Sequence, residues 1–154
     1  MVETSVVILN YNGQKHLKEC FESLEKQTYK DFEIIFVDNA SVDDSVKYVR
    51  ENFPKTRLIV NSINLGFAEG NNVGMRVASG EYIAVLNNDT RLDENWLKNL
   101  VNEAKKHPNL GMCASKMVYY DDPTICNSAG IEVAKNGRGK DRGIKEPSEN
   151  YNMD

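Results

Sequence analysis

Short runs of β-branched and aromatic residues alternate with amphipathic segments along most of this chain of 154 residues. Four such runs cover residues 5–9, 32–37, 58–60 and 82–86. Apolar runs of this length between turn-forming residues are typical of buried strands. Repeated strand–helix units predict an α/β fold, a mostly parallel sheet flanked by helices. Right-handed crossovers then bring the carboxyl end of every strand to the same edge of the sheet.

The segments between these runs have the spacing of helices. One apolar stripe, at offsets of three, four and seven residues, consists of Leu17, Cys20, Phe21 and Leu24. Ser41, with Asp44 three residues further on, resembles a capping box that would begin a second helix. A third helix is predicted over residues 67–78. Because Gly70 and Gly74 disfavour a helix, their presence there indicates a close approach by something else.

The alternation weakens after Asp121-Asp122-Pro123. Residues 112–119 predict a fifth strand, residues 127–133 a further one, and Asn136-Gly137 a hairpin turn. From Gly139 on, glycine and charge dominate, which is typical of a loop or a disordered tail. The sequence thus predicts one domain over residues 1–134 and a tail over residues 135–154.

Polar side chains gather where three of the predicted strands end. They are Asn10, Tyr11 and Asn12 after the first strand, Asp38 and Asn39 after the second, and Asn87 and Asp89 after the fourth. Each is a common turn residue, and a turn is the simplest interpretation of any one of them. Together they predict a ligand site, because open α/β sheets bind ligands at this edge. Asp89 suits a hard divalent cation beside a diphosphate, and Asp38 could accept hydrogen bonds from a base or a ribose.

Composition and missing fingerprints exclude several classes of protein. No G-x-G-x-x-G follows the first strand and no G-x-x-x-x-G-K-[ST] occurs, which argues against dehydrogenases and P-loop proteins. The formal net charge of -4 argues against nucleic acid as a partner. The three cysteines, Cys20, Cys113 and Cys126, form no metal spacing, and no apolar run approaches the ~20 residues of a membrane span. We therefore expect a cytoplasmic protein.

The strand ends resemble those of family 2 glycosyltransferases. The likeness rests on residues 5–12 (SVVILNYN) and 32–41 (FEIIFVDNAS), and on two segments typical of the rhamnosyltransferase-like branch, residues 64–72 (NLGFAEGNN) and 86–90 (LNNDT). The resemblance covers roughly residues 4–133. It implies the A-type glycosyltransferase fold, a Rossmann-like half that binds a UDP-, dTDP- or GDP-linked sugar and a second half that binds a glycan or lipid-linked acceptor.

The resemblance also implies roles for individual residues. Asn87-Asn88-Asp89 occupies the place of the family's D-x-D motif, so Asp89 would bind Mg²⁺ or Mn²⁺ and Asn87 would lie near the ribose or sugar. Asn10, Tyr11, Asn12 and Asp38 match the family's positions around the base and ribose, and Asn64, Gly66 and Asn71 match the segment that closes over the nucleotide or sugar. Asn39 and Asn88 are also expected to bind the donor. A lipid-linked acceptor would bring the full-length protein to the inner face of the membrane.

Two departures from the family pattern limit what the chain is expected to do. The first aspartate of D-x-D is Asn87, which leaves one carboxylate for the metal. The family's general base, which activates the acceptor for an inverting attack, has no counterpart, because Glu132, Glu146 and Glu149 lie in no matching context. We expect that base beyond Asp154 and expect this chain to bind the donor without transferring sugar. An apolar flank left uncovered could also support homo-oligomers.

Three alternatives stay open. A nucleotidyltransferase has a similar sheet and metal site but needs a glycine- and arginine-rich loop after the first strand. A phosphoacceptor signalling domain, with Asp38 as the acceptor, needs an acidic pair where this chain has Asn10-Tyr11-Asn12. A nucleotide-binding module without catalysis would need neither.

Overall fold

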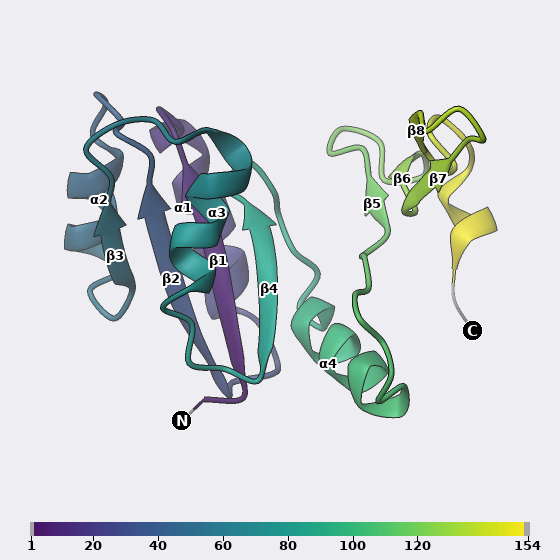
Figure 1. The fold of residues 1–154 in the computed structure, drawn as a ribbon, viewed down its shortest axis with the longest axis horizontal. Coiled ribbons are helices and arrows are strands. Elements are labelled where there is room, and N and C mark those ends of the chain that lie inside the picture. The colour runs from purple at the N-terminus through teal and green to yellow at the C-terminus, as the bar shows by residue number, and fades with distance from the viewer. Residues whose placement is uncertain (1, 153–154) are drawn as a thin grey trace. The chain divides into compact units, whose positions relative to one another are not determined.

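The computed structural model describes residues 2–152, which divide into two compact units on either side of the Val101–Asn102 bond. The first unit alternates strands and helices: β1 (Thr4–Asn10), α1 (Gln14–Glu25), β2 (Phe32–Asp38), α2 (Ser45–Asn52), β3 (Arg57–Val60), α3 (Gly66–Met75), β4 (Tyr82–Asn87) and the start of α4 (Trp96–Lys106) (Figure 1). The second unit contains β5 (Met117–Val118), β6 (Cys126–Ser128), β7 (Ile131–Val133), β8 (Gly139–Asp141) and the short 3-10 helix η1 (Ser148–Tyr151).

The four strands of the first unit form one parallel sheet in the order β3-β2-β1-β4. Asn10 at the end of β1 is in register with Asp38 at the end of β2, and Leu9 is in register with Asn87 at the end of β4. The three polar strand ends therefore meet at one edge, called the carboxyl rim below. The predicted α/β fold with its parallel sheet is confirmed.

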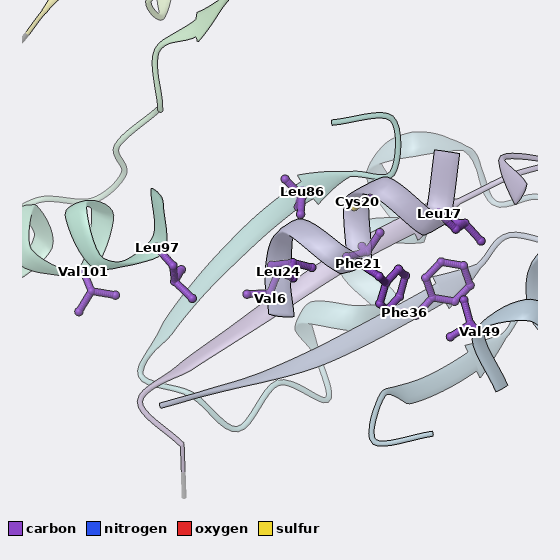
Figure 2. Close-up of a cluster of buried hydrophobic side chains, with 11 residues drawn as sticks. Val6, Leu17, Cys20, Phe21, Leu24, Phe36, Val49, Leu86, Leu97 and Val101 are labelled. Atoms are coloured by element: carbon purple, nitrogen blue, oxygen red, sulfur yellow. The ribbon is translucent and has the colours of Figure 1, made fainter. Parts of the chain in front are cut away.

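Helices α1, α2 and the start of α4 cover one face of the sheet. Figure 2 shows their buried side chains, with Phe21 of α1 close to Phe36 of β2 and Val49 of α2. The ring of Phe21 lies 4.4 Å from the ring of Phe53 in a stacked arrangement. Side chains buried this fully contribute roughly 1.5–3 kcal/mol each. Cys20 belongs to the same cluster, so its predicted place in the core is confirmed.

Helix α3 covers the other face and explains its two glycines. A Cβ atom on Gly74 would lie 2.9 Å from Val37 Cγ2, and one on Gly70 would lie 2.6 Å from Leu9 Cδ1. The helix therefore approaches the sheet more closely than any other residue would allow, as predicted. It leaves β4 uncovered on this face, where Ile83 and Val85 are 44% and 45% exposed.

The second helix does not begin at the predicted capping box. Helix α2 starts at Ser45, with Asp44 before it, and no side chain caps it. The hydroxyl of Ser41 instead accepts hydrogen bonds from Asn10 Nδ2 and from the backbone N–H of Asn12. The Ser41 side chain, which the local pattern assigned to a helix cap, thus makes tertiary hydrogen bonds at the carboxyl rim.

The second unit differs most from expectation. The fifth strand predicted over residues 112–119 was wrong: only Met117–Val118 is a strand, and it pairs antiparallel with β6, outside the main sheet. The strand predicted over residues 127–133 is broken at Gly130, whose φ of 109° favours glycine. The hairpin turn at Asn136-Gly137 is confirmed, because it joins β7 to β8.

Residues 135–152 contain more structure than a loop. Strand β8 and helix η1 lie there, and the backbone N–H of Lys145 donates to the carbonyl of Cys126. These short elements lack a periodic apolar pattern, which is why the sequence predicted none. Over the described residues, no helix combines the length and apolar character needed to cross a membrane.

Candidate functional site

A hollow of about 370 Å³ lies at the carboxyl rim. Its lining consists of Leu9, Tyr11, Asn39, Asn64, Gly66, Phe67, Asn87, Asn88 and Asp89. Seven of these are predicted site residues, brought together from the ends of β1, β2 and β4 and from the start of α3. The other predicted residues, Asn10, Asn12, Asp38 and Asn71, do not line it. The rim therefore has two parts, a hollow and a hydrogen-bonded support beside it.

The support is built on Asn10 and Asp38, both fully buried. Asn10 Nδ2 donates to Asp38 Oδ1 at 3.0 Å, and the backbone N–H of Ser41 donates to Asp38 Oδ2 at 2.9 Å. Both carboxylate oxygens of Asp38 thus already accept a hydrogen bond from the protein. The bond from Asn10 to Asp38 holds the ends of β1 and β2 together.

Hydrogen bonds join the loop after β1, at Asn12, to the loop after β2, at Ser41 and Val42. Asn12, with a φ of 52°, accepts from the backbone N–H of Val42 through its side-chain oxygen at 2.9 Å, while its own N–H donates to Ser41 Oγ. Asparagine tolerates this left-handed conformation better than most residues. These hydrogen bonds fix the loop that carries Tyr11, which is 53% exposed beside the hollow.

Asn39 organises the opposite wall. Its amide nitrogen donates to Asn64 Oδ1 at 2.7 Å and to the carbonyl of Gly66 at 3.1 Å. Its oxygen accepts from the backbone N–H of Leu65 at 3.0 Å and from Asn61 Nδ2 at 3.1 Å. These bonds place the first turn of α3 at the hollow, with Gly66 in the left-handed region at φ 77°.

The segment after β4 carries the exposed polar groups. Asn87 and Asp89 are both exposed, and Thr90 Oγ1 donates to the carbonyl of Asn87 at 2.8 Å. Beneath them, the pKa of the buried Cys20 thiol is raised to about 12, first by burial and then by the negative charge of Asp89, against a hydrogen bond with Thr90 that lowers it. Cys20 therefore stays a protonated, unreactive thiol.

The oxygen ligands at the hollow suit a hard cation only together with ligands from a substrate and water. Asp89 is the one charged side chain in the lining, and Asn87 adds an amide oxygen. The described residues contain no group of three His, Cys, Asp or Glu side chains placed to hold a metal ion. Mg²⁺ commonly binds through one or two carboxylates plus substrate phosphates and water. Asp89 and Asn87 fit a divalent cation on those terms.

Three residues at the rim were not predicted. Phe67 lines the hollow and is 65% exposed, Leu9 contributes an apolar floor, and Ser41 joins the support. A large aromatic residue at the start of the predicted helix, directly after a polar turn, was a signal that could have identified Phe67. Ser41 had no such signal, because its local pattern favours a cap.

Asn71, expected to approach the donor, lies in α3 away from the lining. It is 4% exposed, its Nδ2 donates to the carbonyl of Phe67 at 2.9 Å, and its Oδ1 has no hydrogen-bond partner. Its contact with a donor stays a prediction.

Comparison with known proteins decides the family. The model of the family described as glycosyl transferase family 2 matches residues 5–150 of this chain. The chain belongs to glycosyl transferase family 2. This confirms the family expected from the strand ends, whereas the rhamnosyltransferase-like branch stays a prediction.

Several members of the family are similar to the chain. Glycosyltransferase GlyG of Streptococcus pneumoniae serotype 4 is 36% identical over 107 residues, which are 66% of this chain and 35% of GlyG. The uncharacterized glycosyltransferase YibD of Escherichia coli K12 is 40% identical over 88 residues, 55% of this chain and 25% of YibD. The chain thus spans about a third or less of the length of these relatives.

Solved structures share the fold. S. aureus TarS 1-349 matches with a TM-score of 0.62 and 25% identity over 75% of this chain and 39% of its own. A mannosyltransferase from Pyrobaculum calidifontis, PcManGT, in complex with GDP-Man and Mn²⁺, matches with a TM-score of 0.61 and 23% identity over 80% of this chain and 34% of its own. These likenesses confirm the A-type glycosyltransferase fold.

Proposed function

We propose that this chain is the donor-binding part of an inverting glycosyltransferase that uses a nucleoside-diphosphate sugar and a divalent cation. The observation that carries the proposal is the hollow at the carboxyl rim, where Asp89 lies among amide side chains and two exposed aromatic rings. Family membership supports the reaction class. The structure of TarS 1-349 in complex with UDP-GlcNAc and that of PcManGT with GDP-Man and Mn²⁺ support the donor class.

The charges of the lining support the need for a cation. A nucleoside diphosphate brings at least two negative charges, and Asp89 adds another. Neither lysine nor arginine is among the residues that line the hollow. Like charges at about 4 Å cost roughly 1–4 kcal/mol in water or near a protein surface. Mg²⁺ or Mn²⁺ between Asp89 and the diphosphate would turn that repulsion into attraction, with Asn87 as a further oxygen donor.

The aromatic residues and the amides would position the rest of the donor. Tyr11 and Phe67 offer flat apolar surfaces for the base or for the carbon face of a sugar. The amides of Asn64 and Asn87 supply donors and acceptors for hydroxyl groups. A site of mostly fixed polar groups with a few apolar surfaces is the usual form of a small-molecule pocket.

In the proposed reaction the acceptor hydroxyl forms a bond to the anomeric carbon while the bond to the diphosphate breaks. The configuration inverts, the diphosphate leaves with the electron pair, and a base takes the acceptor proton. The lining of the hollow contains no carboxylate besides Asp89. We therefore propose that other parts of the full-length protein supply the base and the site for a glycan or lipid-linked acceptor. We also propose that the protein acts in the cytoplasm. Ile83 and Val85 supply an exposed apolar surface that could join two copies.

The test is calorimetry of the whole chain with UDP, GDP and dTDP, with and without Mn²⁺. We expect one of the three to bind in the presence of Mn²⁺ and to lose at least tenfold in affinity when EDTA is added. Binding should also raise the melting temperature by mass action. No binding of any of the three, or binding that EDTA leaves unchanged, would refute the proposal.

A further inference from the structure

A relay of three side chains crosses the carboxyl rim from β2 to the segment after β4. Asn88 Nδ2 donates to Asn10 Oδ1 at 2.6 Å, and Asn10 Nδ2 donates to Asp38 Oδ1 at 3.0 Å. The relay joins residues that lie 78 and 28 positions apart in the chain. It links the support directly to the segment that carries Asp89.

The chemistry of the groups fixes the direction of this relay. A carboxylate only accepts hydrogen bonds, and the backbone N–H of Ser41 already occupies the second oxygen of Asp38. Asn10 must therefore turn its NH₂ group towards Asp38, which leaves its oxygen towards Asn88. Asn88 in turn must present its NH₂ group. One charge at position 38 thus sets the orientation of two amides.

Close packing holds the far end of the relay. A Cβ atom on Gly13 would lie 2.6 Å from Asn10 Oδ1 and closer still to Asn88 Nδ2. Only glycine leaves room there for the bond between the two amides. Asn88 is half-buried, whereas its neighbours Asn87 and Asp89 are exposed at the hollow. The one anchored residue lies between the two that are free to meet a ligand.

We propose that Asn88 is a positioning residue: the carboxylate of Asp38, acting through Asn10, orients its amide and thereby sets Asn87 and Asp89 for the cation and the diphosphate. This inference rests on the proposed function for its ligand. It assigns Asn88 and Asp38 to the support of the site, although both were expected to bind the donor directly. It also makes affinity at the hollow depend on a buried charge that does not line it.

The relay predicts an asymmetry between two substitutions. Asn88→Asp alone places a carboxylate against Asn10 Oδ1, and Asn10 cannot turn over because its NH₂ group is held by Asp38. With Asp38→Asn present, position 38 can donate, so Asn10 can turn and donate to the new carboxylate. The same Asn88→Asp change should therefore be harmful in one background and tolerated in the other.

The experiment measures all four chains of this cycle in two ways. Urea unfolding without ligand should show a lower midpoint for Asn88→Asp alone, with most of the loss recovered in the double variant. Calorimetry with Mn²⁺ and whichever of UDP, GDP or dTDP the wild type binds should show at least a tenfold loss for Asn88→Asp, again recovered in the double variant. Repeating the cycle with Asn10→Ala separates the relay from plain repulsion between charges, because only the relay loses its coupling.

The outcomes distinguish the two proposals. If Asn88→Asp tightens metal-dependent binding, side chain 88 faces the cation and the positioning role is wrong. Equal effects of Asn88→Asp in both backgrounds, or coupling that persists with Asn10→Ala, would also overturn the relay. Wild-type chain that binds none of the diphosphates refutes the proposed function and the positioning role with it, while the ligand-free cycle still decides whether the relay exists. If Asn10→Ala does not fold, protection of the Asn88 side-chain amide from hydrogen exchange, lost in Asp38→Asn, serves the same purpose.

Discussion

Asp38 and Asp89 follow two strands of the same sheet, and the structure gives them opposite surroundings. Asp38 is fully buried, and both of its oxygens accept hydrogen bonds from the protein. Asp89 is exposed at the hollow. A buried carboxylate whose two oxygens each accept a hydrogen bond from the protein holds loops together, whereas an exposed one keeps its oxygens for a ligand. The same residue type at the same edge thus serves either the support or the site, according to its neighbours.

The largest expected effect breaks the support. Asp38→Ala removes the acceptor of the Ser41 N–H and one of the two acceptors of Asn10 Nδ2, which keeps its bond to Ser41 Oγ. An unsatisfied donor costs about 1–3 kcal/mol and a lost hydrogen bond about 0.5–1.5 kcal/mol, so the free energy of unfolding should fall by about 2–4 kcal/mol in urea titrations. Asp121→Ala, at an exposed aspartate, is the control. A loss below ~1 kcal/mol would mean that Asp38 is kept for a ligand after all.

The next largest effect removes the ligand side of the comparison. Asp89→Asn should leave the free energy of unfolding within about 0.5 kcal/mol of wild type, because the side chain is exposed. Metal-dependent affinity for a nucleoside diphosphate should fall at least tenfold, while affinity for the free nucleoside changes little. An amide is a poor substitute for the charged oxygen ligand of a hard cation. Calorimetry with both ligands checks this, with Asp121→Asn beside it; equal losses for nucleoside and diphosphate would contradict it.

The sequence could predict which residues lie at the carboxyl rim, but not which of them support the site and which are exposed to a ligand. The apolar pattern and the turn residues locate Asn10, Asp38 and Asn87 at strand ends, because strand ends follow from local pattern. Whether a side chain at such an end turns inward depends on partners far away in the chain. Asn10 is buried because Asp38 and Asn88 meet it, 28 and 78 residues on. The local sequence around Asn10 contains no signal for these long-range contacts.

The second unit shows where prediction from local sequence failed for secondary structure. Residues 112–119 contain one β-branched residue, Val118, and Met112 is 86% exposed. The apolar content that predicted a strand there was not matched by β propensity. In β1 the two agree, since Val6, Val7 and Ile8 are all fully buried. Predictions held where propensity and apolar pattern coincide.

A smaller effect tests the aromatic wall of the hollow. Phe67→Ala should weaken binding of the nucleoside diphosphate or its sugar conjugate by about 1 kcal/mol, at the low end of measured base–aromatic stacking. Its side chain is 65% exposed, so stability should change little. Ile63→Ala is the matched control, because Ile63 is 63% exposed in the loop before α3 and does not line the hollow. Phe67→Tyr should restore binding; a variant as weak as Phe67→Ala would show that the ring itself is not what the ligand meets.

The smallest effect concerns a third carboxylate, Glu33, at the amino ends of the strands. Burial raises the pKa of Glu33, but hydrogen bonds from the Ser79 and Ser5 hydroxyls and the Ser79 N–H, with the charge of Arg57, lower it below its ordinary 4.5. Its Oε1 accepts from Ser5 Oγ at 2.7 Å and from Ser79 Oγ at 2.6 Å, which ties the start of β1 to the turn before β4.

A depressed carboxyl pKa stabilises the fold above the unfolded value and loses that contribution as pH falls through the folded value. Between pH 6 and pH 5 the urea midpoint of Glu33→Gln should therefore lie below that of wild type by a constant amount. Below about pH 4.5 the gap should narrow, because wild type then loses what the variant never had. Nucleoside diphosphate binding at pH 7 should be the same in both, since Glu33 lies at the opposite edge from Asp89. A gap that stays constant down to pH 3 would mean that the hydrogen bonds to Glu33, rather than its charge, hold this edge.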